Sequence, residues 1–370
     1  MTRSAAHSGV LRKDASLINC RFDLDSGSGR SQFTLNHSPA STDHPHLPAP
    51  IVALAGGVGG AKLAYGLALA LGDHLTVIVN TGDDFEHWGL HVSPDLDTVM
   101  YNLAGLNNRE YGWGLAGETF RALELVTRYG GESWFRLGDG DLGTNLLRTR
   151  WLRDGVSLTE VTRRLAAGLG IRASILPMSD QPVRTMVHTD EGVLPFQRYF
   201  VYRRCEPRLL GLEFAGLETA QPSAQVLDAL DRAEAVILCP SNPYLSLDPI
   251  LLLPGLAERL RTLPVPVVAV SPIIGGQALK GPAAKIMAEL GVGATAVAVV
   301  KHIAGRIRLD GFVLDTVDAG LAGDVAALGI TPLVTDTIMR DASSKERLAR
   351  EVLAMVSALA SSKIAPSSLT

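Results

Sequence analysis

Cysteine is scarce in this sequence, with 3 residues in a chain of 370. Cys20, Cys205 and Cys239 are odd in number, widely spaced and form no C-x-x-C pair. A disulfide framework or a cysteine-based zinc site needs paired or closely spaced cysteines. We therefore expect neither of these, and we expect a protein of the reducing cytoplasm.

The chain also lacks a charge excess of one sign and long hydrophobic runs. Its 34 basic and 38 acidic residues leave a formal net charge of -4. This balance argues against a nucleic-acid partner and against binding to an anionic membrane surface. Apolar stretches such as residues 63–71 are much shorter than the roughly 20 residues that span a bilayer. Residues 1–16 do not have the layout of a signal peptide, so we expect no membrane association.

The chain begins instead with a long polar segment. Residues 1–49 are rich in Ser, Gly, Asp, His and Pro and show no sustained apolar period, which is typical of disorder. We predict a disordered N-terminal extension over residues 1–49, a single α/β domain over residues 50–360 and a polar tail over residues 361–370. About residues 105–200 are predicted to form a helical insertion or lid region within that domain.

Short β-branched runs alternate with longer helical patterns, as in α/β folds with a parallel sheet. We predict strands over residues 51–54, 75–79, 172–176, 235–239, 265–270 and 295–300, and a more antiparallel one over 192–201. Helices are predicted over residues 61–71, 94–106, 157–169, 223–232, 252–261, 282–290 and 345–360. The predicted fold is α/β, a Rossmann-like, doubly wound, mainly parallel sheet with a helical insertion.

Five predicted strands end in loops of small, polar or Gly/Pro-rich residues. These loops are residues 56–62, 80–84, 178–182, 240–243 and 271–276. In open α/β sheets, ligands bind beyond the carboxyl ends of the strands. The five loops are therefore predicted to form one continuous active-site rim.

The segment Gly56–Lys62 is the first of these loops. It is not a Walker A sequence, because Leu63 follows Lys62, and its glycines do not fit the G-x-G-x-x-G dinucleotide fingerprint. One interpretation is a tight strand-to-helix turn with an exposed lysine. We favour a second interpretation, in which backbone N–H groups at the helix N-terminus and Lys62 bind a phosphate. Four glycines in five positions exceed what a turn needs.

Carboxylates follow close behind this loop. Asp83 and Asp84 come directly after the second strand, where they either contact a ligand or solvate a turn, and both interpretations stay open. Asp95 and Asp97 fall in the first turn of a helix with Ser93 as its predicted N-cap, where acids also complement the helix dipole. Because Mg²⁺ prefers hard anionic oxygens, we interpret this pair as a magnesium ligand or proton acceptor in a phosphoryl-transfer site.

Two further features are ambiguous on the sequence alone. Trp88, Trp113 and Trp134 are predicted to be core residues more often than platforms for a flat ring. The segment 136–144 is dense in Gly and Asp and precedes Arg148. It is either a mere loop or part of an anion clamp built from arginines.

Several motifs together are similar to those of a known family. They are Ala55-Gly-Gly-Val-Gly-Gly-Ala-Lys62, Val79-Asn-Thr-Gly-Asp-Asp84, Ser93-Pro-Asp-Leu-Asp-Thr98, Leu137-Gly-Asp139, Leu176-Pro-Met-Ser-Asp180, Pro240-Ser-Asn-Pro243 and Val270-Ser-Pro-Ile-Ile-Gly275. Through them the chain resembles the 2-phospho-L-lactate transferases of coenzyme F420 biosynthesis over residues 51 to about 357.

This resemblance implies a Mg²⁺-dependent transfer from a guanosine-diphospho donor. The donor carries 2-phospholactate, phosphoenolpyruvate or 3-phosphoglycerate. The acceptor is the terminal ribityl hydroxyl of the deazaflavin Fo, GMP leaves, and a phosphodiester forms. Both partners would be small-molecule substrates, and the resemblance also implies a homodimer.

The resemblance further assigns roles to residues of this chain. The family's Fo-contacting aspartate matches Asp97, and its basic residue before Leu-Gly-Asp matches Arg136. The chain departs from the family at Gly140 and Asn145, where Arg and His are common. Asp95 and Asp97 are the expected catalytic residues, with Asp83 as a further metal ligand beside them. The expected donor and phosphate contacts are Gly57, Val58, Gly59, Gly60, Lys62, Asn80, Ser241, Asn242, Ser271 and Gly275.

Two other functions compete with this one. A nucleotide-sugar-binding regulatory protein would share the glycine turn and the first α/β units but would show no turnover. An NAD-linked oxidoreductase is suggested by the strand, glycine turn and acid spacing, but the failed fingerprint and the surplus of carboxylates argue against it.

Overall fold

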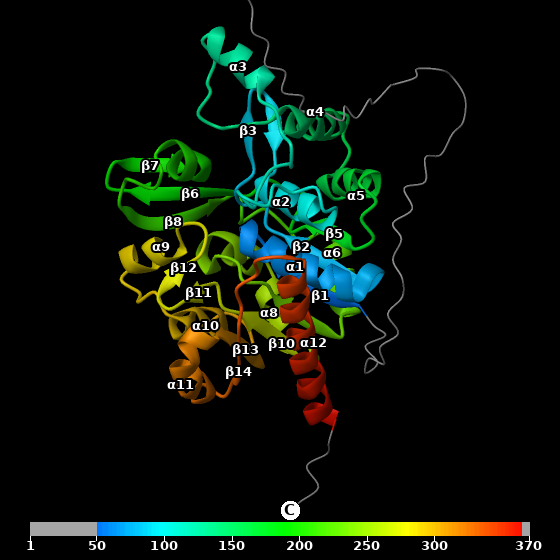
Figure 1. Cartoon of the computed structure of the whole chain (residues 1–370), viewed down its shortest axis with the longest axis vertical. Coiled ribbons are helices and arrows are strands. Elements are labelled where there is room, and N and C mark those ends of the chain that lie inside the picture. Colours follow the sequence, from blue (N-terminus) through cyan, green and yellow to red (C-terminus); the bar gives the residue numbers. More distant parts are fainter. Residues whose placement is uncertain (1–49, 365–370) are drawn as a thin grey trace, which may run out of the picture. The chain divides into compact units, whose positions relative to one another are not determined.

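The computed structural model describes residues 50–364, which are built around a seven-stranded sheet (Figure 1). The strand order is β14-β13-β10-β9-β1-β2-β5, and every neighbouring pair is parallel. The strands are β1 (Ile51–Ala55), β2 (Leu75–Val79), β5 (Ser174–Pro177), β9 (Ala235–Leu238), β10 (Val267–Val270), β13 (Gly311–Asp315) and β14 (Thr331–Thr335). The predicted α/β, Rossmann-like fold is confirmed. The predicted disordered extension and residues 365–370 lie outside the described residues.

Helices cover both faces of this sheet, because successive side chains of each strand point to opposite faces. Ile51 and Ala53 of β1 face one hydrophobic cluster, and Val52 and Leu54 face the other. The first cluster is covered by α1 (Gly57–Leu71), α2 (Pro94–Leu103), α5 (Leu158–Gly168) and α12 (Ala342–Ile364). The second is covered by α6 (Ala224–Asp231), α7 (Asp248–Leu251), α8 (Leu256–Thr262), α9 (Ala283–Glu289), α10 (Ala296–Ala304) and α11 (Ala322–Ala326).

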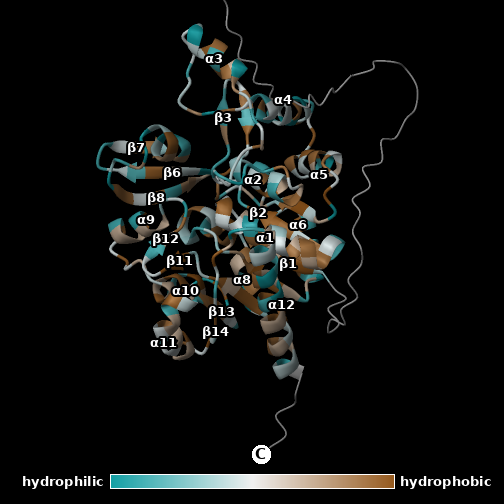
Figure 2. Cartoon of the chain, viewed as in Figure 1, coloured by the Kyte–Doolittle hydropathy of each residue, from teal (hydrophilic) through white to brown (hydrophobic). Residues whose placement is uncertain are grey.

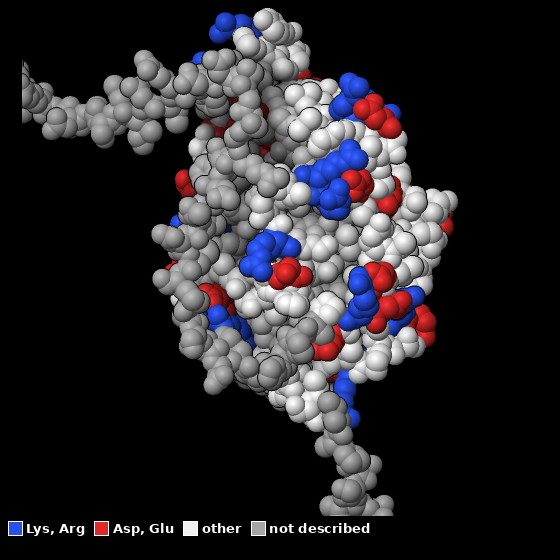
Figure 3. All heavy atoms as spheres, turned by 90° about the vertical axis from the view of Figure 1, so that its right-hand side faces the viewer, with Lys and Arg blue, Asp and Glu red and all other residues white. Residues whose placement is uncertain are grey.

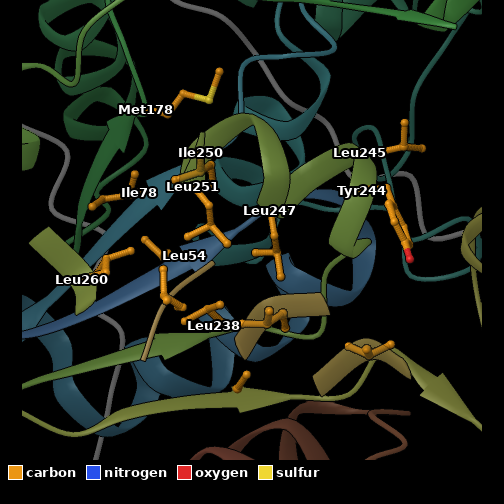
Figure 4. Packing of buried hydrophobic residues seen from close by; sticks show 14 of the residues in the cluster. Leu54, Ile78, Met178, Leu238, Tyr244, Leu245, Leu247, Ile250, Leu251 and Leu260 are labelled. Atoms are coloured by element: carbon orange, nitrogen blue, oxygen red, sulfur yellow. The ribbon is translucent and has the colours of Figure 1, made fainter. Parts of the chain in front are cut away.

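The central strands are completely buried. Figure 4 shows Leu54 of β1, Ile78 of β2 and Leu238 of β9 within one packed cluster that also contains Leu251 and Leu260. All five side chains have no solvent exposure, and burying each one stabilises the fold by about 1.5–3 kcal/mol. The ends of β1, β2 and β9 are therefore held rigidly where their loops begin.

Helices α1 and α12 lie side by side, as Figure 1 shows. Gly66 of α1 permits their close approach, because a Cβ atom at this position would overlap the carbonyl oxygen of Lys345. α12 ends at Ile364, so residues 361–364 of the predicted polar tail belong to a helix. α1 begins at Gly57, four residues before its predicted start, so the glycine motif forms its first turn.

The predicted helical insertion contains more than helices. It includes α3 (Arg121–Arg128) and α4 (Asp139–Arg153), but also the sheet strand β5. A small hairpin precedes it, formed by β3 (Phe85–His87) and β4 (Leu90–Val92). In Figure 2, α3 carries both hydrophilic and hydrophobic residues, and none of its residues is buried.

A second, antiparallel sheet has the order β7-β6-β8. Its strands are β6 (Arg184–Thr189), β7 (Gly192–Pro195) and β8 (Leu209–Ala215). The predicted antiparallel strand over residues 192–201 is correct only in its first part, because the chain leaves the sheet after Pro195 and makes a helical turn at Arg198–Tyr202. The sequence did not reveal β6 or β8.

The strand predicted over residues 295–300 is wrong, because this segment begins helix α10. The Thr295 hydroxyl accepts a hydrogen bond from the Ala298 N–H and caps the helix. Ala296, Val299 and Ile303 are buried at helical spacing, a pattern that a short apolar window cannot distinguish from a strand. Strand β13 comes after this helix and was not predicted, and neither was β14.

The surface carries charges of both signs. On the face shown in Figure 3, Lys and Arg side chains lie next to Asp and Glu side chains in small mixed groups. Exposed pairs such as Arg163 with Glu160 and Arg150 with Asp154 are of this kind. Among the helices of residues 50–364, none combines the length and the apolar character needed to cross a membrane.

Candidate active site

The chain changes direction beside β1, an interior strand of the sheet next to the central strand β9. From β1 it proceeds to β2 and β5 on one side, and later to β9, β10, β13 and β14 on the other. The loops that follow β1 and β9 therefore separate at their carboxyl ends, which is where open α/β sheets bind ligands. A cavity of about 560 Å³ lies there. Loops after β1, β2, β9 and β10 contribute to its lining, together with α2, α4 and residues 196–201. Four of the five loops of the predicted rim therefore meet at the cavity, but the fifth, residues 178–182, does not line it.

The glycine motif packs tightly against its neighbours. A Cβ atom on Gly56 would come within 2.6 Å of an Asp95 carboxylate oxygen, and one on Gly60 within 2.5 Å of the Ser241 hydroxyl. A Cβ atom on Gly59 would overlap the Pro240 carbonyl oxygen. Gly57 has a φ of 64°, which costs most other residues about 1–2 kcal/mol. Close packing therefore accounts for much of the glycine content.

Some N–H groups of this turn remain available to a ligand. The Gly56 N–H donates to the Ser241 hydroxyl at 3.0 Å, and the Gly57 N–H donates to Asp95 at 2.7 Å. The N–H groups of Val58 and Gly59 also lie in the first helical turn, where no earlier carbonyl can accept them. Both residues line the cavity, so their N–H groups suit an anion there, as helix N-termini do.

Lys62 adds a positive charge one turn further along α1. Its ammonium group lines the cavity and donates to the Met339 carbonyl oxygen at 3.1 Å. Burial lowers the pKa of Lys62, and the nearby charge of Lys280 lowers it further. Both effects penalise the charged form, and an anion in the cavity would offset them.

Two carboxylates that line the cavity, those of Asp83 and Asp95, converge on Asn80. The Asn80 Nδ2 group donates to Asp95 at 3.0 Å and also to Asp83. Burial, followed by repulsion from Asp95 and Asp84, raises the pKa of Asp83 well above its usual range. Burial also raises the pKa of Asp95, to about 6. Two acids that contact the same nitrogen atom form a site that a cation would stabilise.

This arrangement fits magnesium. Within residues 50–364, no group of three or more His, Cys, Asp or Glu side chains is arranged to hold a metal ion. Mg²⁺, however, usually takes only one or two protein carboxylates and completes its shell with water and substrate phosphate oxygens. Asp83 and Asp95 both line the cavity and supply such a pair.

Asp97 is in a different environment. Its carboxylate forms a buried ion pair with Arg148 of α4, with one N–H···O distance of 3.1 Å. Burial raises the pKa of Asp97, and Arg148 offsets part of that rise. The cationic partner of Asp97 is thus a protein side chain, so Asp83 and Asp95 are the better fit for the metal.

Asp84, which was predicted as either a ligand contact or a loop acid, is not at the cavity. It is 2% exposed and accepts hydrogen bonds from the Ser93 hydroxyl at 2.8 Å and from His91 at 3.1 Å. Ser93 does occupy the N-cap position of α2, but its side chain makes no capping bond. Asp84 instead connects the loop after β2 to the start of α2.

Part of the cavity lining is aromatic. Trp113, Trp134, Phe135, Phe196 and Phe200 line it, and such ring faces suit a flat heteroaromatic ligand. The prediction that Trp113 and Trp134 are core residues is therefore wrong, because both reach the cavity. Trp88 does not line it, and its indole N–H donates to the Glu132 carbonyl oxygen.

Polar groups lie next to these rings. Arg136 lines the cavity, and its guanidinium lies 4.5 Å from the centre of the Phe120 ring. Asp141 of α4 also lines the cavity. Burial first, and then the charge of Asp97, raise the pKa of Asp141 to about 7. Tyr101 donates to the Thr144 hydroxyl at 2.9 Å.

The loops after β9 and β10 border the glycine end. Asn242 caps the next helical turn through its Oδ1 atom, while its buried Nδ2 group has no partner within the described residues. Ser241 and Ser271 also line the cavity. An unpaired donor beside the glycine turn suits a polar group of a ligand.

Most residues predicted as catalytic, metal or substrate contacts do line one cavity. With Ser271, which also lines the cavity, they number eleven: Gly57, Val58, Gly59, Lys62, Asp83, Asp95, Asp97, Arg136, Ser241, Asn242 and Ser271. Three other predicted contacts do not line it. Gly60 packs on Ser241, Asn80 supports the two carboxylates from behind, and the Gly275 N–H donates to Asp318 at 3.1 Å. The sequence analysis did not select Asp141, Phe196 or Phe200, although Asp141 lies in the Gly/Asp-dense segment.

The chain is similar to known proteins over most of its length. Residues 51–349 match the family described as 2-phospho-L-lactate transferase CofD. A phosphoenolpyruvate transferase of Streptomyces griseus is 43% identical over 309 residues, which cover 82% of this chain and 97% of the relative. A 2-phospho-L-lactate transferase of Methanosarcina mazei is 38% identical over 304 residues, with coverage of 82% and 99%.

A more distant structural relative supports the fold alone. A crystal structure of a UPF0052 family member from Bacillus halodurans superposes with a TM-score of 0.54 at 15% identity, covering 83% of this chain and all of that one (100%). The family match and the two closer relatives cover the whole sheet and the cavity. This chain therefore belongs to the 2-phospho-L-lactate transferase family and is a transferase of coenzyme F420 biosynthesis.

Proposed function

We propose that the protein transfers a phospho-hydroxyacid from a guanosine-diphospho donor to the terminal ribityl hydroxyl of the deazaflavin Fo. The reaction depends on Mg²⁺ and releases GMP. The transferred acid is 2-phospholactate, phosphoenolpyruvate or 3-phosphoglycerate, all of which share a phosphate and a carboxylate. The product is F420-0 or its dehydro or glycerate analogue.

One observation carries this proposal, namely that a single cavity joins three chemically distinct regions. Its glycine end offers the Val58 and Gly59 N–H groups and Lys62 to phosphate oxygens. Its lining also offers the carboxylates of Asp83 and Asp95. Other parts of its lining offer aromatic rings. A phosphorylated donor, a divalent cation and a flavin-like acceptor would occupy these three regions.

The proposed bond changes are those of a transfer at phosphorus. The ribityl hydroxyl oxygen attacks the phosphorus that carries the acid, and the bond from that phosphorus to the GMP oxygen breaks. Asp97 accepts the hydroxyl proton or its hydrogen bond on the acceptor side. Val58, Gly59 and Lys62 bind the oxygens on which negative charge develops, which is where such donors lower the barrier most. Asp83 and Asp95 would hold Mg²⁺, whose chemistry here is neutralisation of phosphoryl charge.

The decisive experiment identifies products by mass spectrometry. Purified protein is mixed with Fo, Mg²⁺ and, in separate reactions, the guanosine-diphospho conjugate of each of the three acids. We expect GMP and a deazaflavin whose added mass identifies the transferred acid. Omitting the donor is the blank, and adding EDTA should stop turnover.

The same reactions separate the competing functions. Donor binding with no GMP from any of the three conjugates would refute the proposal and favour a nucleotide-binding protein without turnover. A spectral titration with NAD should show no binding, and saturable binding at the aromatic end would favour an oxidoreductase. A wild-type rate in Asp97→Asn would remove Asp97 from the reaction while leaving the transfer itself intact.

A further inference from the structure

Arg148 is a fully buried arginine that holds both oxygens of Asp97. Its Nη1 atom donates to Asp97 Oδ2 at 3.1 Å, and its Nη2 atom donates to Oδ1. Nη1 also donates to the Asn145 Oδ1 atom at 2.5 Å. The two residues of the ion pair are 51 positions apart, on α2 and α4. A planar guanidinium that binds both oxygens fixes the plane of the carboxylate as well as its position.

The pair is asymmetric with respect to the cavity. Asp97 and Asn145 line it, whereas Arg148 does not. The Arg148 side chain is 1% exposed and that of Asp97 is 10% exposed. The guanidinium therefore lies behind the carboxylate as seen from the cavity, and Arg148 can influence a ligand only through Asp97 and Asn145.

Asn145 strengthens this support. Its Oδ1 atom accepts from Arg148, and its Nδ2 atom donates to the Asp141 carbonyl oxygen at 2.8 Å. Asn145 thus fixes the guanidinium from a second side. Each Asp97 oxygen keeps acceptor capacity after binding one N–H group, and Asp97 lines the cavity.

Burial of this arginine is not explained by stability alone. The Arg148 Nε atom is buried and has no hydrogen-bond partner within the described residues. A buried ion pair with an unpaired N–H group is weak evidence for stabilisation, because apolar residues of similar volume often serve as well. A role that needs the guanidinium fork itself accounts for the arrangement better.

We propose that Arg148 is a positioning residue for the transfer reaction, which holds the Asp97 carboxylate in one orientation toward the acceptor hydroxyl. The proposal rests on the proposed function, because it assigns Asp97 to the acceptor side. Fixing the acceptor of a hydrogen bond before the substrate arrives aligns the attacking oxygen and removes the need to reorder it during the reaction.

A purely structural role for Arg148, as a link between α2 and α4, is the alternative. The same two helices are also linked by the Tyr101 hydroxyl, which donates to Thr144 at 2.9 Å. Thr144 does not line the cavity. Thr144→Val therefore loosens the α2–α4 contact without touching Asp97 and serves as the matched control.

The test compares the wild type, Arg148→Lys, Arg148→Met and Thr144→Val. The wild type is assayed first with Fo and the three guanosine-diphospho conjugates, so that a failure of the proposed function appears before any variant is made. For each variant, kcat and the KM values for Fo and for the active donor are measured separately. GDP affinity and Tm are measured on the same preparations.

Arg148→Met is expected to lower kcat by about 10–100-fold and to raise the KM for Fo, while GDP affinity stays within about twofold of wild type. Arg148→Lys retains the positive charge but lacks the planar guanidinium that binds both oxygens. Its kcat should therefore lie between those of Arg148→Met and the wild type. Thr144→Val should lower Tm and leave kcat near wild type.

Two results would overturn the proposal. One is a wild-type kcat in Arg148→Lys, since a point charge would then suffice and orientation by the fork would be unnecessary. The other is an equal loss of kcat in Arg148→Met and Thr144→Val at equal loss of Tm, which is the result expected of a structural link. If Arg148→Met does not fold, Arg148→Lys decides between the outcomes by itself.

Discussion

Replacing Asp141 by asparagine should make the protein more stable at neutral and alkaline pH. Burial and the nearby charge of Asp97 raise the pKa of the Asp141 carboxyl from 3.8 to about 7. A carboxyl whose pKa is higher in the folded than in the unfolded state adds to the free energy of unfolding. This contribution is fully present below the unfolded-state pKa, and it is lost as the pH rises through the folded-state pKa. The wild type should therefore lose stability between about pH 4 and pH 7, and Asp141→Asn should not lose this part.

The size of the effect follows from the shift. About three pKa units at roughly 1.4 kcal/mol each give an upper bound of about 4 kcal/mol. Asp141 is only partly buried, so solvent screens part of this penalty. We therefore expect the free energy of unfolding to change by about 1–2 kcal/mol. This is a measurable fraction of the stability of a typical domain.

Urea unfolding at pH 5 and at pH 8, followed by tryptophan fluorescence, measures the effect. The stability difference between Asp141→Asn and wild type should increase in favour of the variant from pH 5 to pH 8. Asp139 gives a control of opposite sign, because hydrogen bonds from Thr119 and from backbone N–H groups lower the pKa of its carboxyl. Asp139→Asn should lose stability at neutral pH. A difference for Asp141→Asn that is the same at both pH values would refute the reasoning.

Two further predictions concern the glycine turn and the carboxylate pair. Gly59→Ala should lower stability by about 1–3 kcal/mol and weaken GDP binding, because its Cβ atom would overlap the Pro240 carbonyl oxygen. The control Gly143→Ala, at an open position of α4, should stabilise the protein by about 0.5–1 kcal/mol. Urea unfolding measures the stability of both variants, and calorimetry measures their GDP affinity. Equal effects of the two substitutions would contradict the packing argument. Asp83→Asn should raise the Mg²⁺ concentration for half-maximal turnover about tenfold or more, since one of two carboxylates is lost. A magnesium titration of activity tests this, and an unchanged midpoint would exclude Asp83 as a ligand.

Local sequence patterns predicted the parts of the fold that depend on short-range interactions. The β1 and β2 strands and the long helix after the glycine motif were found because apolar runs and glycine turns constrain the backbone over a few residues. The same patterns failed at α10, where five apolar residues in a row suit a strand or a buried helix equally well. There, packing on the sheet and the Thr295 cap decided the outcome.

The sequence by itself determined the family, the parallel sheet and the residues of the glycine end, because each of these is encoded in contiguous motifs. Only the tertiary structure paired Asp97 with Arg148 and separated it from Asp83 and Asp95. Only the tertiary structure also brought Trp113, Trp134 and Phe196 to one wall of the cavity. These groups come from segments far apart in the chain, and their contacts depend on how the helices and the small sheet pack, which no local pattern specifies.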